Sequence, residues 1–185
     1  MTIPVPGRPP VVGVVGWKNN GKTTLVERLI AHFVAEGLAV STVKHAHHEV
    51  EVDQPGKDTW RHREAGAREV VLATARRFAI IHELREAPEP SLDALLDRLA
   101  PCDLVIVEGF KRFAHPKVEA HRAERGTPLL AAEDPTVFVV ASDEPLPGLS
   151  IPLLHLDDVA GIAACIRRRL GLQPASLRPG PATPA

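Results

Sequence analysis

Cysteine, net charge and long apolar runs are all scarce in this sequence. It has only Cys102 and Cys165, too few for a disulfide framework or a cysteine-based metal site, as expected in a reducing cytoplasm. The formal net charge of −1 excludes the basic field of a nucleic-acid-binding protein. There is no run of about 18 apolar residues, and the start lacks a basic-then-apolar signal segment. We therefore predict a cytoplasmic protein that contacts neither nucleic acid nor membrane.

Lysine is scarce as well, with six lysines against sixteen arginines. The compact, movable ammonium group of lysine differs chemically from the planar guanidinium of arginine. Four of the six lysines lie in or just before loops that follow predicted strands or turns, which points to those loops, although chance placement of six residues is an alternative. These four are Lys22, Lys44, Lys57 and Lys111.

A phosphate-binding pattern lies near the start of the chain. The apolar, β-branched run Val11–Val15 predicts a buried strand, and G-x-x-x-x-G-K-T follows it from Gly16 to Thr23. Residues 22–36 then predict an amphipathic helix, with a glycine after it as a stop signal. A strand, a glycine-rich loop and a helix in this order are typical of a phosphate-binding loop (P-loop).

Each conspicuous residue of this loop has a chemical reason to be there. Gly16 and Gly21 let backbone N–H groups close around phosphate oxygens, because glycine adopts conformations that a Cβ forbids. The positive end of the helix dipole adds to this attraction. We expect Lys22 to reach the β- and γ-phosphates and the Thr23 hydroxyl to bind Mg²⁺.

A polar stretch over residues 44–62 is the second informative part of the chain. Three histidines, His45, His47 and His48, lie near three carboxylates, and this composition allows a metal site. However, the histidines lack the i, i+4 spacing of ligands on a helix, and no cysteine accompanies them. A polar loop facing the triphosphate is the favoured interpretation, with Asp53 positioning water. For His47 and His48, solvated loop positions are an equal alternative.

A third informative stretch, over residues 103–111, holds a continuous apolar run between two acids. The run predicts a strand buried on both faces. At about 3.3 Å per residue, Asp103 and Glu108 are roughly 17 Å apart. Ligands of open parallel sheets bind beyond the carboxyl ends of the strands. Glu108 is therefore predicted to hold Mg²⁺, directly or through water, and Asp103 to lie at the surface.

The remaining patterns predict an α/β fold of the P-loop NTPase class, in which helices flank a mostly parallel sheet with extra antiparallel strands. We predict one domain over residues 1–172 and a Pro/Ala-rich, disordered tail over residues 173–185. Three helices have predicted N-terminal caps. Asp58 or Thr59 is expected to cap a short helix that ends near Gly66, and Ser91 to cap a helix that runs through Ala100. Asp157 is expected to cap a last helix, which ends at Gly171. Further strands are predicted over residues 38–43, 69–75, 78–84, 118–121 (at a sheet edge), 136–141 and 151–156.

An acid just beyond a buried strand is a candidate for recognising the base. Asp143 follows the strand predicted over residues 136–141, and its carboxylate could accept hydrogen bonds from N1–H and N2–H₂ of guanine. The usual Asn-Lys-x-Asp guanine signature is absent, so little else in the sequence indicates the base.

Taken together, these motifs resemble a known family. The loop G-W-K-N-N-G-K-T-T-L, the block K-H-x-H-H…D-x-P-G-K-D-T-W-R-H…A-G-A and the strand L-V-I-V-E-G-F-K are similar to the molybdopterin-guanine dinucleotide biosynthesis protein B (MobB) family. The resemblance covers roughly residues 10–172. It implies a homodimeric P-loop protein that binds GTP with Mg²⁺ and hydrolyses it weakly. Its partners would be the molybdenum cofactor guanylyltransferase, which joins GMP to molybdopterin, and molybdopterin itself.

The same resemblance assigns roles to individual residues. It implies catalytic roles for Asp53, Lys57 and Glu108, and metal binding by Thr23 and Glu108. The residues that it implies in nucleotide binding are Gly16, Asn19, Asn20, Gly21, Lys22, Thr23, Thr24, Lys44, His45, Asp58 and Asp143.

Two other functions and one mode of assembly follow from the sequence. An ATP-dependent small-molecule kinase or ligase would share the loop, and Arg61, Arg63, Arg76 and Arg77 could then serve as a mobile lid. A pure binding adaptor without turnover is the other alternative.

The minimal P-loop core does not need residues 78–84 or 118–130, so we predict a two-fold homodimer built on these additions. Phe78, Ile80 and Phe113 would supply apolar contacts, although burial within one subunit would explain them equally well.

Overall fold

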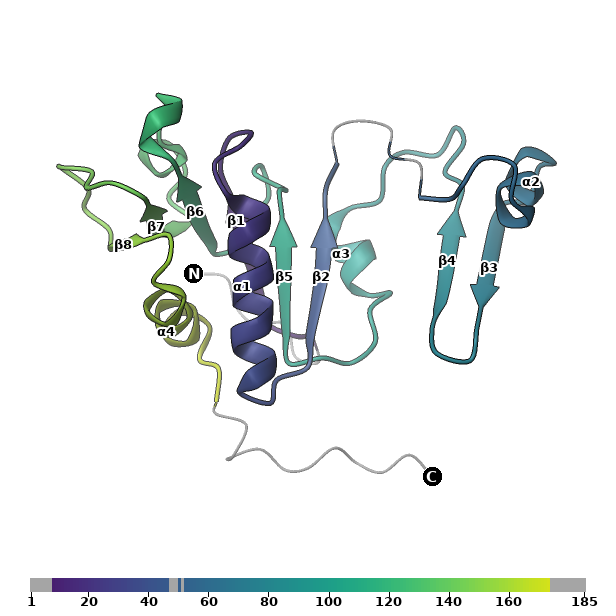
Figure 1. The fold of residues 1–185 in the computed structure, drawn as a ribbon, viewed down its shortest axis with the longest axis horizontal. Helices are drawn as coiled ribbons and strands as arrows, with labels where there is room; N and C mark the ends of the chain where they lie inside the picture. Colours follow the sequence, from purple (N-terminus) through teal and green to yellow (C-terminus); the bar gives the residue numbers. More distant parts are fainter. Residues whose placement is uncertain (1–7, 47–49, 51, 174–185) are drawn as a thin grey trace. The chain divides into compact units, whose positions relative to one another are not determined.

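The computed structural model describes residues 8–46, 50 and 52–173. The chain forms two compact units, the first made by residues up to His45 and from Leu92 onward, and the second by Ala46–Ser91. Within the described ranges, no helix is long and apolar enough to cross a membrane. Figure 1 shows the elements of both units.

A six-stranded sheet forms the centre of the first unit. Its strand order is β2-β5-β1-β6-β7-β8, and every neighbouring pair is parallel. Because parallel strands share a direction, their carboxyl ends lie along one edge of the sheet. The strands are β1 (Val11–Val15), β2 (Val40–Lys44), β5 (Leu104–Glu108), β6 (Lys117–His121), β7 (Val137–Ser142) and β8 (Leu153–His155).

Helices cover both faces of this sheet. One face packs against α1 (Lys22–Ala35) and α4 (Val159–Leu170), whose apolar sides share a core cluster with β1, β5, β6 and β7. The short helix α3 (Leu92–Leu96) packs on the other face against β5. The predicted fold class is confirmed, and in Figure 1 α1 lies alongside β1 and β5.

Strand β6 is not the edge strand that its sequence suggests. It pairs with β1 on one side and β7 on the other, and all five of its residues are buried. Alternating polar and apolar residues usually indicate one solvated face. Here the segment before β7 covers the polar face, since Lys117 donates to Asp134 at 2.8 Å and Glu119 accepts from the Leu130 backbone N–H at 2.8 Å.

Helix ends differ from the prediction in small ways. Asp158, not Asp157, caps α4 by accepting from the Gly161 N–H at 2.9 Å. Asp157 instead forms an ion pair with Arg28 of α1. Helix α3 ends at Leu96 rather than at residue 100, and turns continue to residue 99. The predicted stop of α4 at Gly171 is confirmed, since this residue has a left-handed φ of 65°.

The second unit contains α2 (Asp58–Glu64) and the antiparallel pair β3 (Glu69–Ala73) and β4 (Phe78–His82). The predicted hairpin is therefore present, and it forms a two-stranded sheet of its own. Neither Asp58 nor Thr59 caps α2, because the cap position is Lys57, which makes no side-chain capping bond.

Candidate functional site

The loop between β1 and α1 adopts a conformation that only its particular residues allow. Gly16, Asn19 and Gly21 have φ values of 147°, 65° and 86°, which a β-branched residue would adopt only with strain. A Cβ added to Gly16 would lie 2.4 Å from the carbonyl oxygen of Ala120. The loop can therefore approach β6 closely only with glycine at position 16.

Lys22 lies at the start of α1, and its ammonium group donates to the carbonyl oxygen of Trp17 at 2.8 Å. Partial burial, and then the nearby cation Lys111, lower the pKa of Lys22. Both causes disfavour the charged ammonium group, whereas the nearby Glu108 favours it. An anion bound in the loop would add to the effect of Glu108.

The predicted metal-binding residues lie together at the carboxyl edge of the sheet. The Thr23 hydroxyl donates to Oε1 of Glu108 at 3.0 Å, and Lys44 Nζ lies 3.4 Å from the same oxygen. Strand register brings them there, because Lys44 of β2 is directly opposite Glu108 of β5. A hydroxyl and a carboxylate are ligands that Mg²⁺ prefers, so this donor set fits that ion.

The two acids of β5 should therefore differ in their effect on nucleotide binding. Asp103 lies at the amino end of the strand, where it accepts from the Ala39 backbone N–H at 2.8 Å. We expect Glu108→Gln to weaken Mg²⁺-dependent nucleotide binding by about tenfold, or roughly 1.4 kcal/mol. Asp103→Asn should change it less than about twofold. Calorimetry with and without Mg²⁺ measures both, and a larger loss in Asp103→Asn would contradict the proposed metal site.

The other predicted residues belong to different units of the chain. The His45 ring packs against Phe110, with ring centroids 4.7 Å apart, close to Glu108. Asp53, Lys57 and Asp58 belong to the second unit, and there Asp53 lies 3.9 Å from Nε of Arg63.

The hypothesis of a histidine metal site involves residues that the structure does not describe. His47 and His48 lie outside the described residues. In the part of the chain that is described, no three His, Cys, Asp or Glu residues are grouped to hold a metal ion.

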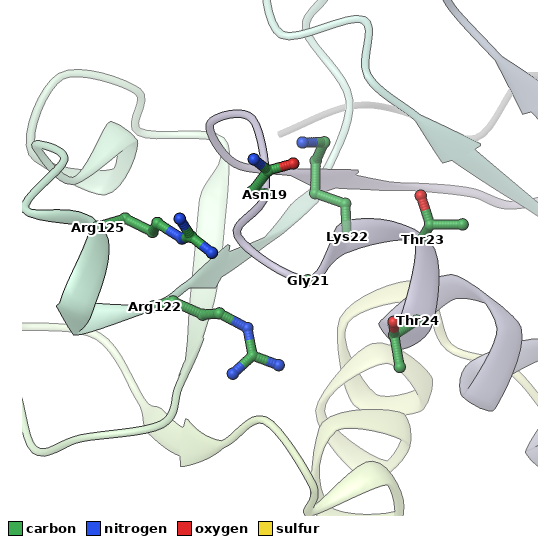
Figure 2. Close-up of a pocket in the computed structure, with 7 residues that line it drawn as sticks. All are labelled: Asn19, Gly21, Lys22, Thr23, Thr24, Arg122 and Arg125. Carbon is green, nitrogen blue, oxygen red and sulfur yellow. The ribbon is translucent and has the colours of Figure 1, made fainter.

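A pocket of about 420 Å³ opens beside the loop, a size typical of small-molecule sites. Two of its residues, Arg122 and Arg125, come from the segment after β6 (Figure 2). The sequence analysis did not identify these arginines, because an arginine after a strand that is predicted to lie at the sheet edge carries no functional signal. Only the position of β6 next to β1 brings that segment to the loop. The other lining residues are Asn19, Gly21, Lys22, Thr23 and Thr24.

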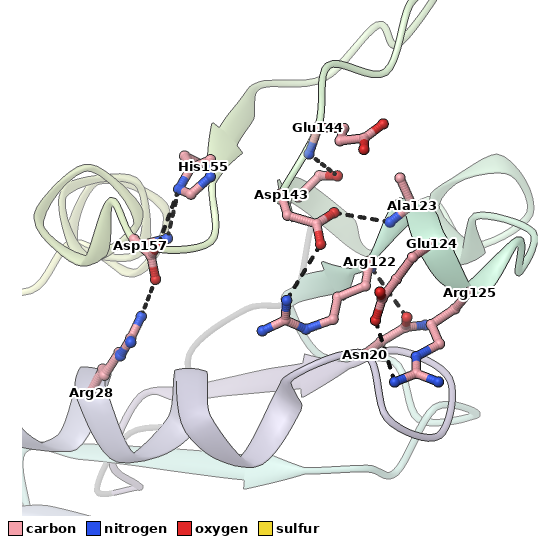
Figure 3. Close-up of polar contacts among 11 residues, drawn as sticks. Asn20, Arg28, Arg122, Ala123, Glu124, Arg125, Asp143, Glu144, His155 and Asp157 are labelled. Atoms are coloured by element: carbon pink, nitrogen blue, oxygen red, sulfur yellow. Dashed lines mark hydrogen bonds and ion pairs between the residues drawn. The ribbon is translucent and has the colours of Figure 1, made fainter.

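Asp143 lies at the end of β7, close to this arginine-bearing segment (Figure 3). Its Oδ1 accepts from the Ala123 backbone N–H at 2.9 Å, and its Oδ2 lies 3.4 Å from Nη1 of Arg122. The carboxylate thus faces a guanidinium group, and base recognition by Asp143 stays a prediction.

Comparison with known proteins agrees with the motifs that line this site. The family model of MobB, described as molybdopterin guanine dinucleotide synthesis protein B, matches residues 11–143. The chain belongs to this family. It therefore has a role in molybdopterin guanine dinucleotide synthesis. The match to MobB runs from the first residue of β1 to Asp143 and so includes Glu108, Arg122 and Arg125.

Individual relatives are similar over most of their length. A molybdopterin-guanine dinucleotide biosynthesis adapter protein of Haemophilus influenzae is 42% identical, with 87% of this chain and 89% of that protein aligned. The adapter protein of the same name from Escherichia coli is 38% identical, over 83% and 89% of the two chains. The crystal structure of a MobB homologue from Bacillus stearothermophilus superposes with a TM-score of 0.66 at 30% identity, covering 88% of this chain and 99% of that one.

Proposed function

We propose that this protein is a GTP-binding adapter that assists the conversion of molybdopterin to molybdopterin-guanine dinucleotide in the cytoplasm. It binds GTP with Mg²⁺ in the loop after β1, hydrolyses it weakly and acts beside the molybdenum cofactor guanylyltransferase, with molybdopterin as a further contact. The adapter role comes from the names of its relatives.

One observation carries the nucleotide part of this proposal. Lys22, Thr23 and Glu108 lie together at the carboxyl edge of a parallel sheet, beside a glycine loop and a helix start. Backbone N–H groups and the Lys22 ammonium group suit phosphate oxygens. Bound Mg²⁺ would neutralise charge on the β- and γ-phosphates.

The proposed roles of residues in the first unit follow their positions, and those of Asp53, Lys57 and Asp58 follow the motifs shared with the MobB family. Phosphate is held by the loop residues other than Trp17 and Lys18, while Lys44 places a second cation beside Glu108. The His45 backbone N–H donates to the Glu108 carbonyl oxygen at 2.9 Å, and we assign His45 to the nucleotide site on this neighbourhood. We assign Asp53 and Lys57 to catalysis and Asp58 to nucleotide binding, with Asp53 positioning water for hydrolysis.

The choice of nucleotide tests this proposal. A carboxylate at position 143 would gain two charge-assisted hydrogen bonds from guanine and would face an unpaired N1 lone pair in adenine. We expect GTP to bind about tenfold more tightly than ATP, a difference of roughly 1.4 kcal/mol. Base recognition by Asp143 requires that Asp143→Ala narrow that preference, whereas an equal loss for GTP and ATP means that the carboxylate acts through Arg122.

Calorimetry with GTP and ATP, with and without Mg²⁺, measures the preference directly. Equal affinities in the unmodified protein would reject GTP selectivity and favour the ATP-dependent kinase or ligase. A single-turnover hydrolysis assay then separates a weak GTPase from a pure binding adaptor.

The proposed homodimer rests on the hairpin of the second unit. Val71 and Ile80 are directly opposite each other, as are Ala73 and Phe78, so these residues share one face of the hairpin. The exposed fractions of Val71, Ile80 and Phe78 are 59%, 56% and 71%. Such an apolar face, together with the free edge of a two-stranded sheet, suits a second copy. Residues 118–121 cannot contribute an edge, because β6 pairs on both sides.

Light scattering checks the assembly. We expect the unmodified protein to have the mass of a dimer at micromolar concentration. We expect a variant that combines Ile80→Asp and Phe113→Asp to be a monomer, because both side chains are exposed in one subunit and a charge there opposes association. A monomer mass for the unmodified protein, with and without GTP and Mg²⁺, would refute the dimer. A dimer that persists in the double variant would place the interface elsewhere.

A further inference from the structure

Two arginines face the phosphate-binding loop from a segment that no motif identifies. Arg122 follows β6, and Arg125 ends the short 3-10 helix η1 (Ala123–Arg125). Both line the same pocket as Lys22 and Thr23, and in Figure 2 their side chains extend toward that pocket. Their guanidinium groups therefore lie close to where a loop-bound phosphate would be.

The segment that carries these arginines is attached to the loop itself. Asn20, only 1% exposed, accepts from the Arg122 backbone N–H at 3.1 Å and donates from Nδ2 to the Thr127 hydroxyl at 3.1 Å. One loop side chain thus holds the segment near both of its ends. Preorganised donors bind a ligand at lower entropic cost.

Charge and geometry in the pocket both favour a phosphate. Lys22, Arg122 and Arg125 are the charged residues among those described as lining it, and none of the lining residues is acidic. Guanidinium groups recognise phosphate in a bidentate way that an ammonium group cannot match. The side chains of Arg122 and Arg125 are 39% and 46% exposed, and each has one carboxylate near a single nitrogen, Asp143 for Arg122 and Glu124 for Arg125, so other N–H donors can meet a ligand.

Asp143 is placed to orient one of these arginines. Its Oδ1 binds the backbone of Ala123, directly after Arg122, while its Oδ2 lies 3.4 Å from Nη1 of the Arg122 guanidinium (Figure 3). This contact involves a single nitrogen of a group with five N–H donors. The carboxylate can therefore hold the direction of the side chain while other donors face the pocket.

We propose that Arg122 and Arg125 bind phosphoryl oxygens of the triphosphate held in the loop, and that Asp143 is a positioning residue for Arg122. This inference rests on the triphosphate-binding part of the proposed function. In this inference the Asp143 carboxylate contacts the Arg122 guanidinium group, whereas in base recognition it would contact guanine.

Titration calorimetry with GTP and with inorganic tripolyphosphate, both with Mg²⁺, tests the two arginines. Arg122→Ala and Arg125→Ala should each weaken both ligands by about tenfold, the effect of one lost charged hydrogen bond. Arg122→Lys should recover part of the loss, because it keeps the charge without the bidentate geometry. Arg168→Ala, an exposed arginine of α4 outside this pocket, is the matched control and should bind like the unmodified protein.

A double-mutant cycle tests the positioning role. Asp143→Asn should weaken GTP, ATP and tripolyphosphate by one common factor, and it should have little further effect when Arg122 is already alanine. A loss confined to GTP would assign Asp143 to the base and overturn its positioning role. Equal losses with and without Arg122 would indicate a general structural defect and overturn it too.

The outcomes also separate this inference from the proposed function. If the unmodified protein binds GTP and both arginine variants bind it equally well, the inference is wrong and the proposed function stands. If tripolyphosphate binds through the arginines but GTP does not bind, the GTP-binding function fails and the arginine site stands. Circular dichroism confirms in each case that the variant is folded.

Discussion

Lys22→Ala is expected to abolish triphosphate binding while leaving the protein folded. The ammonium group is partly buried beside Lys111, and both conditions lower its pKa, so a bound anion would stabilise its charged form. Losing a charged contact to two phosphates should weaken binding by at least roughly 100-fold, or about 3 kcal/mol. Calorimetry with GTP and Mg²⁺ measures the loss.

Folding should not suffer from this substitution. Alanine is the best helix former, and position 22 begins α1. Removing the cation also removes its repulsion with Lys111. Lys18→Ala is the matched control, because Lys18 is an exposed lysine of the same loop and does not line the pocket. A folded Lys22→Ala variant with unchanged affinity would disprove the phosphate-loop assignment.

The second large effect concerns stability at low pH. His115 is 7% exposed, and neither ring nitrogen has a hydrogen-bond partner among the residues that the structure describes. Burial, and then the neighbouring Lys117, lower its pKa to about 4. Between about pH 6.5 and pH 4 the unfolded chain binds a proton at this histidine that the folded chain does not bind. The contribution of His115 to stability is therefore lost as the pH falls through this window.

The size of this effect follows from the shift in pKa. A change from 6.5 to about 4 corresponds to about 3 kcal/mol of unfolding free energy lost by pH 4. His115→Leu should flatten the profile, because leucine binds no proton. Urea denaturation at several pH values measures it, with His155→Leu, an exposed histidine of the same unit, as the control.

His115 packs tightly enough that one variant could fail to fold. A Cβ added to Gly13 would lie 2.4 Å from Nε2 of His115, so the ring lies directly on β1. His115→Gln provides a second variant that also cannot titrate. If the slope between pH 6.5 and 4 is unchanged in both variants, the proton uptake occurs elsewhere.

Much of the site was predictable because local sequence determines it. The strand Val11–Val15 and the helix start at Lys22 were predicted at the residues where they occur. The choice of Glu108 over Asp103 followed from strand direction alone, and Glu108 does lie beside Thr23. Such features depend on neighbours in the chain, on glycine conformations and on the direction of a parallel strand.

The order of strands in the sheet was not predictable in this way. The sequence 117–121 alternates between polar and apolar residues, and this pattern looks the same for an edge strand and for a central strand with a covered polar face. Lys117 and Glu119 are buried only because Asp134 and the backbone of residues 130 and 131 provide their partners. Those partners lie 11 to 17 positions away in the sequence.

The sequence by itself therefore determined the strand, glycine loop and helix start around Lys22, and the position of Glu108 at the end of β5. Only the tertiary structure decided that Arg122 and Arg125 join the same pocket, because β6 pairs beside β1 and Asn20 ties the following segment to the loop. It also decided that Asp143 faces a guanidinium group. The physical reason is that a sequence motif reflects contacts within one segment. Strand pairing instead brings together segments far apart in the chain, such as those of Asn20 and Arg122, which are 102 residues apart.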